Sequence, residues 1–184
     1  MRGLWSGAFT LADFAEQMEA TIHRGLTAAW YAGAAECGIT PEDLSEEERE
    51  ELAYRIELEN GFVEDFGLAI READKAAGGL LRPLMSRAEL WVNRWDAIET
   101  RAKAMACGNQ KARWELGPTE HCRDCAHMAG RVYRYSTWEK YGILPRSPLL
   151  ECGGFRCQCE LVDTDEPATR GRPPQLVGYG KRIG

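Results

Sequence analysis

Five of the seven cysteines lie close together in the last third of this 184-residue chain. They form two groups, Cys122-Arg-Asp-Cys125 and Cys152-Gly-Gly-Phe-Arg-Cys157-Gln-Cys159, with 26 residues between the groups. Thiolates at such spacings can converge on one tetrahedral Zn²⁺ at about 2.3 Å, and a structural zinc can hold together a small module that has little core. The sequence therefore predicts a zinc-stapled module, and the pattern does not by itself indicate catalysis.

Five cysteines for four coordination places leave the ligand set open. Cys122 and Cys125 form a clear first knuckle. Cys157 and Cys159 are separated by a single residue, which two ligands manage less comfortably than a C-x-x-C loop, so Cys152 with either of them is an alternative second pair. Disulfides or unlinked thiols among these five residues are the competing interpretations.

The remaining cysteines and the histidines are expected to have other roles. His121 and His127 flank the first knuckle and could each replace a thiolate, although a histidine in such a place more often lies outside the ligand set. His23 falls near the apolar face of a predicted helix, which indicates a structural residue. Cys37 and Cys107 lie among small apolar residues and are expected to be packing thiols.

No catalytic constellation accompanies the cysteines. A Cys-His nucleophile needs an orienting partner, which the adjacency of His121 and Cys122 in sequence does not supply. The zinc deaminase pattern needs H-x-E before P-C-x-x-C, but Arg24-Gly25 follow His23, and His121 stands where the proline would be. A thioredoxin-like C-x-x-C needs a βαβ context that is missing from the pattern. We therefore expect no enzymatic activity and no catalytic residues.

Charge is distributed unevenly along the chain, whose net charge is −6. Residues 1–100 carry 20 acidic against 9 basic side chains, whereas residues 101–147 carry 4 acidic against 9 basic. The basic stretch around the cysteines could contact nucleic acid, an acidic partner or the acidic half of a neighbouring copy. The acidic balance of the whole chain argues against a dedicated DNA-binding protein.

The sequence shows neither a membrane-spanning run nor a signal peptide. No apolar stretch approaches the roughly 18 residues that are needed to cross a bilayer. Residues 1–7 lack the apolar core of a signal peptide. A cytoplasmic protein without a membrane partner is expected, and in that compartment metal-bound thiolates are favoured over disulfides.

Apolar residues recur at spacings of three and four through the first hundred positions, which predicts long amphipathic helices. Thr10 is a candidate N-cap for the first helix, and Ser45 with Glu48 gives the capping-box pattern that opens the second. Gly61 falls inside the second helix, which could nevertheless be continuous. The predicted helices cover 10–38, 45–77 and 86–114.

These patterns predict a mainly α fold in three parts. A helical, bundle-like domain is expected over 1–117, since no βαβ alternation or internal repeat is found. A small Cys-rich, zinc-stapled α+β module is expected over 118–162, with a strand-like stretch at 130–135. The Pro- and Gly-rich tail over 163–184 is expected to be extended or flexible and to gain order only against a partner.

Three further sequence features occur together over about 100–162. They are the run from Arg101 through Trp114 and Gly117-Pro-Thr to His121-Cys-Arg-Asp-Cys125, the pieces Gly130-Arg-Val132 and Ser136-Thr-Trp138, and the closing Cys152-Gly-Gly-Phe-Arg-Cys157-Gln-Cys159-Glu-Leu161. Together they resemble the C-terminal part of tailed-phage minor head proteins, the Mu F-like head morphogenesis family. In that family a helical region is followed by tryptophan, a C-x-x-C knuckle, a small β segment and a closing C/H…C-x-C group. Many members have a histidine three residues before the C-x-C pair, where this chain has Cys152 five residues before it.

The resemblance implies a structural component of the virion, present in few copies in the procapsid or head-to-tail region. Its implied partners are the portal, scaffold or major capsid protein, with packaged DNA as a further contact. The implied location is the host cytoplasm during assembly and then the virion head or head-tail region. The main alternative is a zinc-containing nucleic-acid-binding protein or nuclease that acts during DNA packaging. A small adaptor whose acidic helices bind a host protein is a third hypothesis.

A passive mechanism joins the zinc module to this role. Zinc would fix the loop 118–162, so that Arg131, Arg134, Lys140 and Arg146 present a defined basic face. The helices and the tail would then supply contacts to a portal or a neighbouring subunit.

Overall fold

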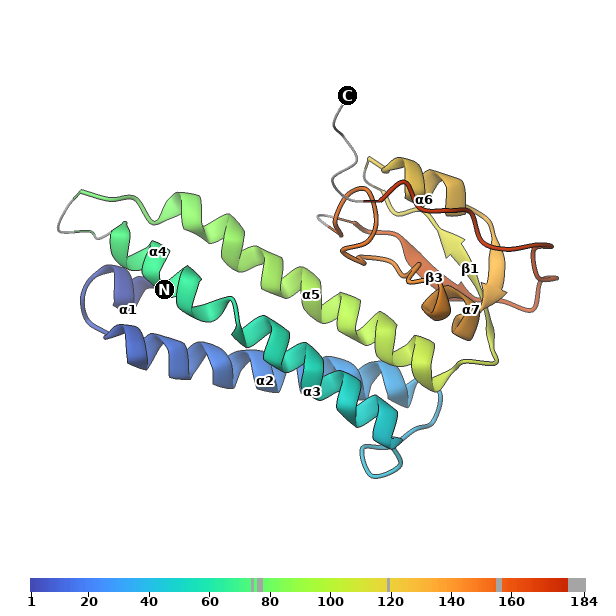
Figure 1. Ribbon diagram of the computed structural model, residues 1–184, viewed down its shortest axis with the longest axis horizontal. Coiled ribbons are helices and arrows are strands. Elements are labelled where there is room, and N and C mark those ends of the chain that lie inside the picture. Colours follow the sequence, from blue (N-terminus) through green and yellow to red (C-terminus); the bar gives the residue numbers. More distant parts are fainter. Residues whose placement is uncertain (74, 76–77, 119, 155–156, 179–184) are drawn as a thin grey trace. The chain divides into compact units, whose positions relative to one another are not determined.

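The computed structural model describes residues 1–184 except 74, 76–77, 119, 155–156 and 179–184 (Figure 1). Helices dominate the described residues, and a small three-stranded sheet follows them, so the predicted mainly α fold with a small α+β module is confirmed. The elements are α1 (Arg2–Trp5), α2 (Leu11–Ala35), α3 (Glu46–Asn60), α4 (Val63–Glu72), α5 (Arg82–Ala106), β1 (Lys111–Glu115), α6 (Arg123–Met128), β2 (Val132–Arg134), α7 (Tyr135–Lys140) and β3 (Glu160–Asp163). Within the described ranges, none of the helices is long and apolar enough to cross a membrane.

The chain forms two compact units whose boundaries differ from the expected domains. The first unit contains residues 1–28 and 45–92, and the second contains 29–44 and 93–184. The last turns of α2 and α5 therefore belong with the cysteine-rich part, instead of ending a separate domain at residue 117.

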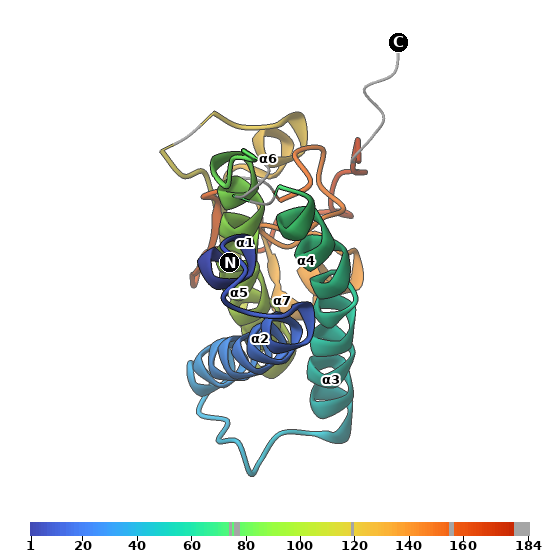
Figure 2. The same ribbon diagram turned by 90° about the vertical axis from the view of Figure 1, so that its left-hand side faces the viewer.

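Two capping interactions fix the helix starts of the first unit as predicted. Thr10 and Asp13 exchange hydrogen bonds, with the Thr10 N–H 2.9 Å from Asp13 Oδ2 and the Asp13 N–H 3.1 Å from Thr10 Oγ1. Ser45 and Glu48 form the capping box that opens α3. Instead of one helix over 45–77, α3 and α4 follow one another nearly in line and are separated at Gly61 (Figure 2). Phe66 on α4 is fully buried, and its ring lies 6.1 Å from that of Phe14 and 5.0 Å from that of Trp91.

The end of the third predicted helix is a strand. α5 ends at Ala106, and the turn that follows is closed by the Gln110 N–H, which donates to the carbonyl oxygen of Cys107 at 2.8 Å. Residues 111–115 then alternate between partly buried and buried, with Ala112 and Trp114 on the buried face. This period of two is the period of a strand, and it overrides the helical propensity of the preceding Ala-rich run.

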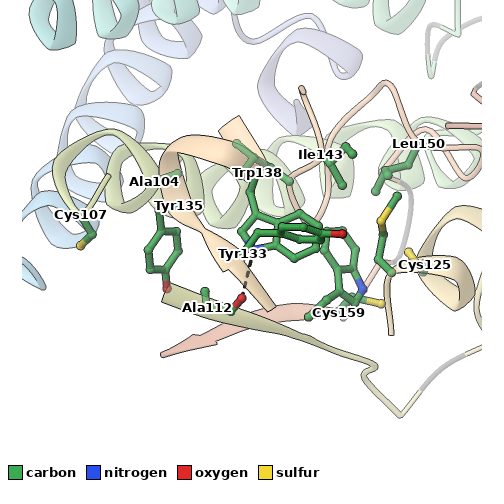
Figure 3. Packing of buried hydrophobic residues seen from close by; sticks show 13 residues of the cluster. Ala104, Cys107, Ala112, Cys125, Tyr133, Tyr135, Trp138, Ile143, Leu150 and Cys159 are labelled. Atoms are coloured by element: carbon green, nitrogen blue, oxygen red, sulfur yellow. Dashed lines mark hydrogen bonds between the residues drawn. The ribbon is translucent and has the colours of Figure 1, made fainter. Parts of the chain in front are cut away.

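The second unit has its core on the antiparallel sheet, whose strand order is β2-β1-β3. The rings of Trp114 and Trp138 lie 5.7 Å apart, and Tyr133 meets Trp138 edge-on at 4.9 Å. The buried Trp138 Nε1–H donates to the carbonyl oxygen of Ala112 at 3.1 Å (Figure 3). Two of the five predicted metal-binding cysteines, Cys125 and Cys159, belong to the same buried cluster, so the sheet core supports the cysteine site directly.

The tail after β3 has no helix or strand up to residue 178, as expected, yet it binds its own unit. The Thr169 N–H donates to the carbonyl oxygen of Val132 at 2.8 Å, and Leu176 packs against the buried cluster. The expectation that the tail gains order only against a partner therefore does not hold for residues 164–178. The end of the predicted tail, 179–184, lies outside the described residues.

Candidate metal centre

The structure brings all five predicted cysteines together around Cys125. Cys122 is the N-cap of α6, and Cys125 lies in its first turn. The other three lie in the segment between α7 and β3. The sulfurs of Cys122, Cys125 and Cys152 lie within 4.8 Å of one another, and so do those of Cys125, Cys157 and Cys159. These five residues could hold a metal ion, and Cys125 belongs to both groups.

A cavity of about 20 Å³ lies between the five thiols. Its lining also includes Glu120, His121 and Gln158. A volume of this size holds about one water-sized sphere, so it fits a single ion better than a cluster of metals. Soft thiolates in such a set favour Zn²⁺, Cu(I) or iron in tetrahedral geometry.

Backbone amides face several of the sulfurs. The Cys125 N–H donates to Cys122 Sγ at 3.5 Å. The backbone N–H groups of Gly154 and Gly117 are hydrogen-bonded to the sulfurs of Cys152 and Cys159. Since an N–H donor stabilises a thiolate more than a thiol, these contacts prepare the sulfurs to bind a cation.

The thiols also shift one another's pKa values. Contact with the thiol of Cys125, and then with those of Cys152 and Cys159, lowers the pKa of Cys157. Contact with Cys152, Cys157 and Cys159 raises the pKa of Cys125. Thiolates this close together would repel one another, and a bound cation would offset that repulsion.

The three histidines have different relationships to the site. His121 Nδ1 lies 3.8 Å from Cys159 Sγ, and His121 lines the cavity, so it is a sixth candidate ligand. His127 is exposed on α6, outside the lining, and its carbonyl oxygen accepts a hydrogen bond from Arg131 Nε at 2.8 Å. His23 is exposed on α2, so the expectation that it lies near the apolar face is wrong.

Two glycines allow the cysteines to meet. A Cβ on Gly117 would overlap the carbonyl oxygen of Gln158, the residue between the last two cysteines. A Cβ on Gly154, whose φ is +76°, would overlap the carbonyl oxygen of Arg146. Both close approaches need glycine. In the sequence, Gly117-Pro118 indicates only a helix end, so the sequence alone does not predict that Gly117 helps to place Cys159.

The two residues between the knuckle cysteines also build the site. The Arg123 N–H donates to Glu151 Oε2 at 2.7 Å, and its guanidinium pairs with Glu151 Oε1 at 2.7 Å. Asp124 is only 1% exposed, and Asp124 Oδ2 accepts the Glu151 N–H at 2.7 Å. The knuckle is therefore tied to the residue immediately before Cys152, which brings the second cysteine group to the first.

Cys37 and Cys107 form a disulfide in the structure, which corrects the expectation of packing thiols. Their Cα atoms are 5.5 Å apart, a normal separation for a disulfide. The last turns of α2 and α5 approach closely within the second unit, because a Cβ on Gly33 would overlap the carbonyl oxygen of Glu99. This unit therefore combines one oxidised cysteine pair with the five free thiols of the cluster.

The predicted basic face is smaller than expected. Arg134 and Lys140 are exposed, and Arg131 is half-buried. Arg146 is turned inward, with a side chain 16% exposed, and its Nε lies 3.4 Å from Asp96 Oδ2. It therefore does not belong to the basic face.

A larger polar cavity of about 390 Å³ lies elsewhere in the second unit. The two bases that line it are both ion-paired, Lys103 with Glu36 at 2.5 Å and with Asp163 at 3.0 Å, and Arg146 with Asp96. These pairs fasten α5 to the residue that follows α2, to β3 and to the segment after α7. We therefore assign the cavity a structural role and take the cysteine cluster as the candidate site.

Comparison of the chain with protein-family models, with curated proteins and with solved structures gave no match. A function for the chain therefore depends on the chemistry of its own residues and on the motif resemblance.

Proposed function

We propose that this protein is a structural minor head protein of a tailed bacteriophage, which acts in capsid assembly or at the portal and is stapled by Zn²⁺. The observation that carries the proposal is the convergence of the five cysteines on a cavity large enough for one ion. The same five residues contribute most to the resemblance to the Mu F-like family. A cluster built for a single ion, with sulfur ligands and amide donors, is typical of structural zinc sites.

Zinc would be held by Cys125 and three further ligands. The candidates for these three places are the other four cysteines of the cluster and His121. When bound, the ion supplies a crosslink between α6 and the segment that precedes β3. Residues outside the ligand set position the two cysteine groups. Asp124 and Arg123 hold the loop at Glu151, and Gly117 lets the closing cysteines approach the knuckle. A rigid surface results, which is what an assembly protein needs.

Exposed charge supports a role in binding a partner. Arg134 and Lys140 are exposed on the cysteine-rich unit, while α3 in the other unit exposes four glutamates, which are Glu46, Glu47, Glu50 and Glu57. The proposed partners are the portal, scaffold or major capsid protein, with packaged DNA as a further contact. Charge of both signs on separate units suits a protein that joins other components.

Two measurements test the proposal. Elemental analysis of the purified protein should give about one zinc per chain, with cluster thiols that react only after chelation. Mass spectrometry of particles made by the phage or prophage that encodes the chain should find it in heads. A metal-loaded protein that never enters particles would overturn the head assignment and leave the zinc module intact.

The nucleic-acid alternative makes a different prediction. Steeply salt-dependent DNA binding would favour it, because phosphate contacts release counterions. Cleavage of DNA by the purified protein with Mg²⁺ or Zn²⁺ would establish a nuclease and would contradict a purely structural role.

A further inference from the structure

The C-terminal segment 164–178 begins on β1, where the Thr164 N–H donates to the carbonyl oxygen of Lys111 at 3.0 Å. Beyond it, residues 169–178 are held at two separate places on the second unit. The first is the outer edge of β2, where the Thr169 N–H donates to the carbonyl oxygen of Val132 and Thr169 Oγ1 accepts the Val132 N–H at 2.9 Å. Next to it, the hydroxyl of Tyr133 donates to the carbonyl oxygen of Arg172 at 3.3 Å. These contacts hold residues 169–172 on the edge strand and use no part of the metal centre.

The second place is the knuckle. The Val177 N–H donates to Asp124 Oδ1 at 2.6 Å, and the Gly178 N–H donates to Asp124 Oδ2 at 3.2 Å. Pro173 is buried, and Leu176 packs against the buried cluster. The end of the segment is therefore held by a carboxylate that lies between Cys122 and Cys125 in sequence.

The burial of Asp124 makes this contact energetically important. A buried carboxylate must be hydrogen-bonded, and Asp124 accepts backbone N–H groups from Glu151, Val177 and Gly178. Two of these three donors come from the C-terminal segment. The position of Asp124 is set in turn by α6, whose first turn is the C-x-x-C knuckle. The Asp124 side chain therefore takes part both in the ordered knuckle and in the docking of residues 173–178.

We propose that metal binding at the cysteine cluster locks residues 173–178 onto the second unit through Asp124, and that loss of the metal releases this part of the segment while 164–172 remain on β1 and β2. The proposal rests on the zinc half of the proposed function and is independent of the phage assignment. Metal binding orders small cysteine-rich modules, and coupling between two events is reciprocal, so docking of the segment must strengthen metal binding by the same factor. The state of the metal centre thus decides whether the chain offers a free C-terminal arm to a partner.

Amide hydrogen exchange of the full chain, zinc-loaded and then chelated, tests the coupling. We expect the exchange rates of the Val177 and Gly178 amides to rise by about tenfold or more on chelation, as loss of a hydrogen bond to a charged group implies, and the rate of Thr169 to change much less. If a protein with one bound metal shows no change at Val177 and Gly178, only the coupling is overturned. If the chain binds no metal, the zinc function and the coupling fail together. If the whole second unit loses protection, general unfolding replaces local release and the proposal is also overturned.

Variants of the full chain test the coupling from both sides, by changing either Asp124 in the knuckle or Val177 in the C-terminal segment. Asp124→Asn should raise exchange at Val177 and Gly178 in the zinc-loaded protein, whereas Asp165→Asn, which changes an exposed carboxylate of the same segment, should not. Val177→Pro removes one donor to Asp124 but substitutes no residue of the knuckle, so every candidate metal ligand is kept. By reciprocity, Val177→Pro should weaken zinc affinity, measured against a chromophoric chelator, by about the factor that zinc adds to docking. Zinc affinity within twofold of the unaltered chain would overturn the proposal.

Discussion

The Sγ atoms of Cys125 and Cys157 lie 3.9 Å apart, although the two residues are 32 positions apart in the chain. This contact joins the C-x-x-C knuckle of α6 to the closing C-x-C group before β3. Cys125 is buried and belongs to both groups of mutually close thiols, whereas each of the other four cysteines belongs to one. The five candidate ligands are therefore not equivalent.

Serine substitutions should reveal this inequality. Cys125→Ser is expected to reduce bound zinc from about one per chain to near zero, because Cys125 is the residue that both groups of mutually close thiols share. Cys152→Ser is the matched control and should keep about one zinc with weaker affinity, because three cysteines and His121 remain around Cys125. Elemental analysis after gel filtration measures both. Retention of zinc by Cys125→Ser at unchanged affinity would contradict the central position of this residue.

The Cys37–Cys107 disulfide is expected to stabilise the second unit independently of the metal. It closes a loop with a sequence separation of 70, for which the chain-entropy model gives about 4 kcal/mol. The double variant Cys37→Ser/Cys107→Ser should therefore lower the free energy of unfolding in urea by about 2–4 kcal/mol relative to the oxidised protein. Its zinc content should not change, and a variant that lost zinc would show that the two sites depend on each other.

Gly33 is the glycine that permits close packing of α2 on α5 within the second unit. Gly33→Ala places a methyl group against the backbone of Glu99 and should cost about 1–3 kcal/mol of stability, as other overpacked sites do. Gly61→Ala is the control, since its φ is −57° and its Cβ would make only ordinary contacts. That substitution should be neutral or stabilise by up to about 1 kcal/mol. Denaturant unfolding measures both variants against the unaltered chain. The midpoint should fall for Gly33→Ala and should stay the same or rise for Gly61→Ala.

Local chemistry explains which parts of the fold were predictable from the sequence. The caps at Thr10 and Ser45 were predictable because each depends on a partner three residues away. The strand at 111–115 was not predictable, because its five residues continue a helical pattern and become a strand only by pairing with residues 132–134 and 160–163. In residues 111–115, pairing with distant strands therefore outweighs the local helix propensity.

The same distinction applies to the site. The five cysteines were predictable from residue type and spacing, since a metal centre needs soft ligands within a short reach. Asp124 and Gly117 were not, because their roles depend on backbone groups 27 or more residues away, which no short motif records. The disulfide between Cys37 and Cys107 depends likewise on two helix ends that meet in space.

The exposed bases supply the test of partner binding. Arg134→Gln together with Lys140→Gln removes two exposed charges of the cysteine-rich unit, so we expect unchanged zinc content, unfolding energy within about 0.5 kcal/mol and reduced incorporation into phage heads. Arg146→Gln is the control, because it removes a positive charge from a side chain that is turned inward. Because it breaks the contact with Asp96, it should cost about 0.2–1 kcal/mol of stability and leave incorporation near normal. Quantitative mass spectrometry of purified heads, normalised to the major capsid protein, compares the two. Equal incorporation of both variants and the unaltered chain would show that Arg134 and Lys140 do not contact the assembly partner.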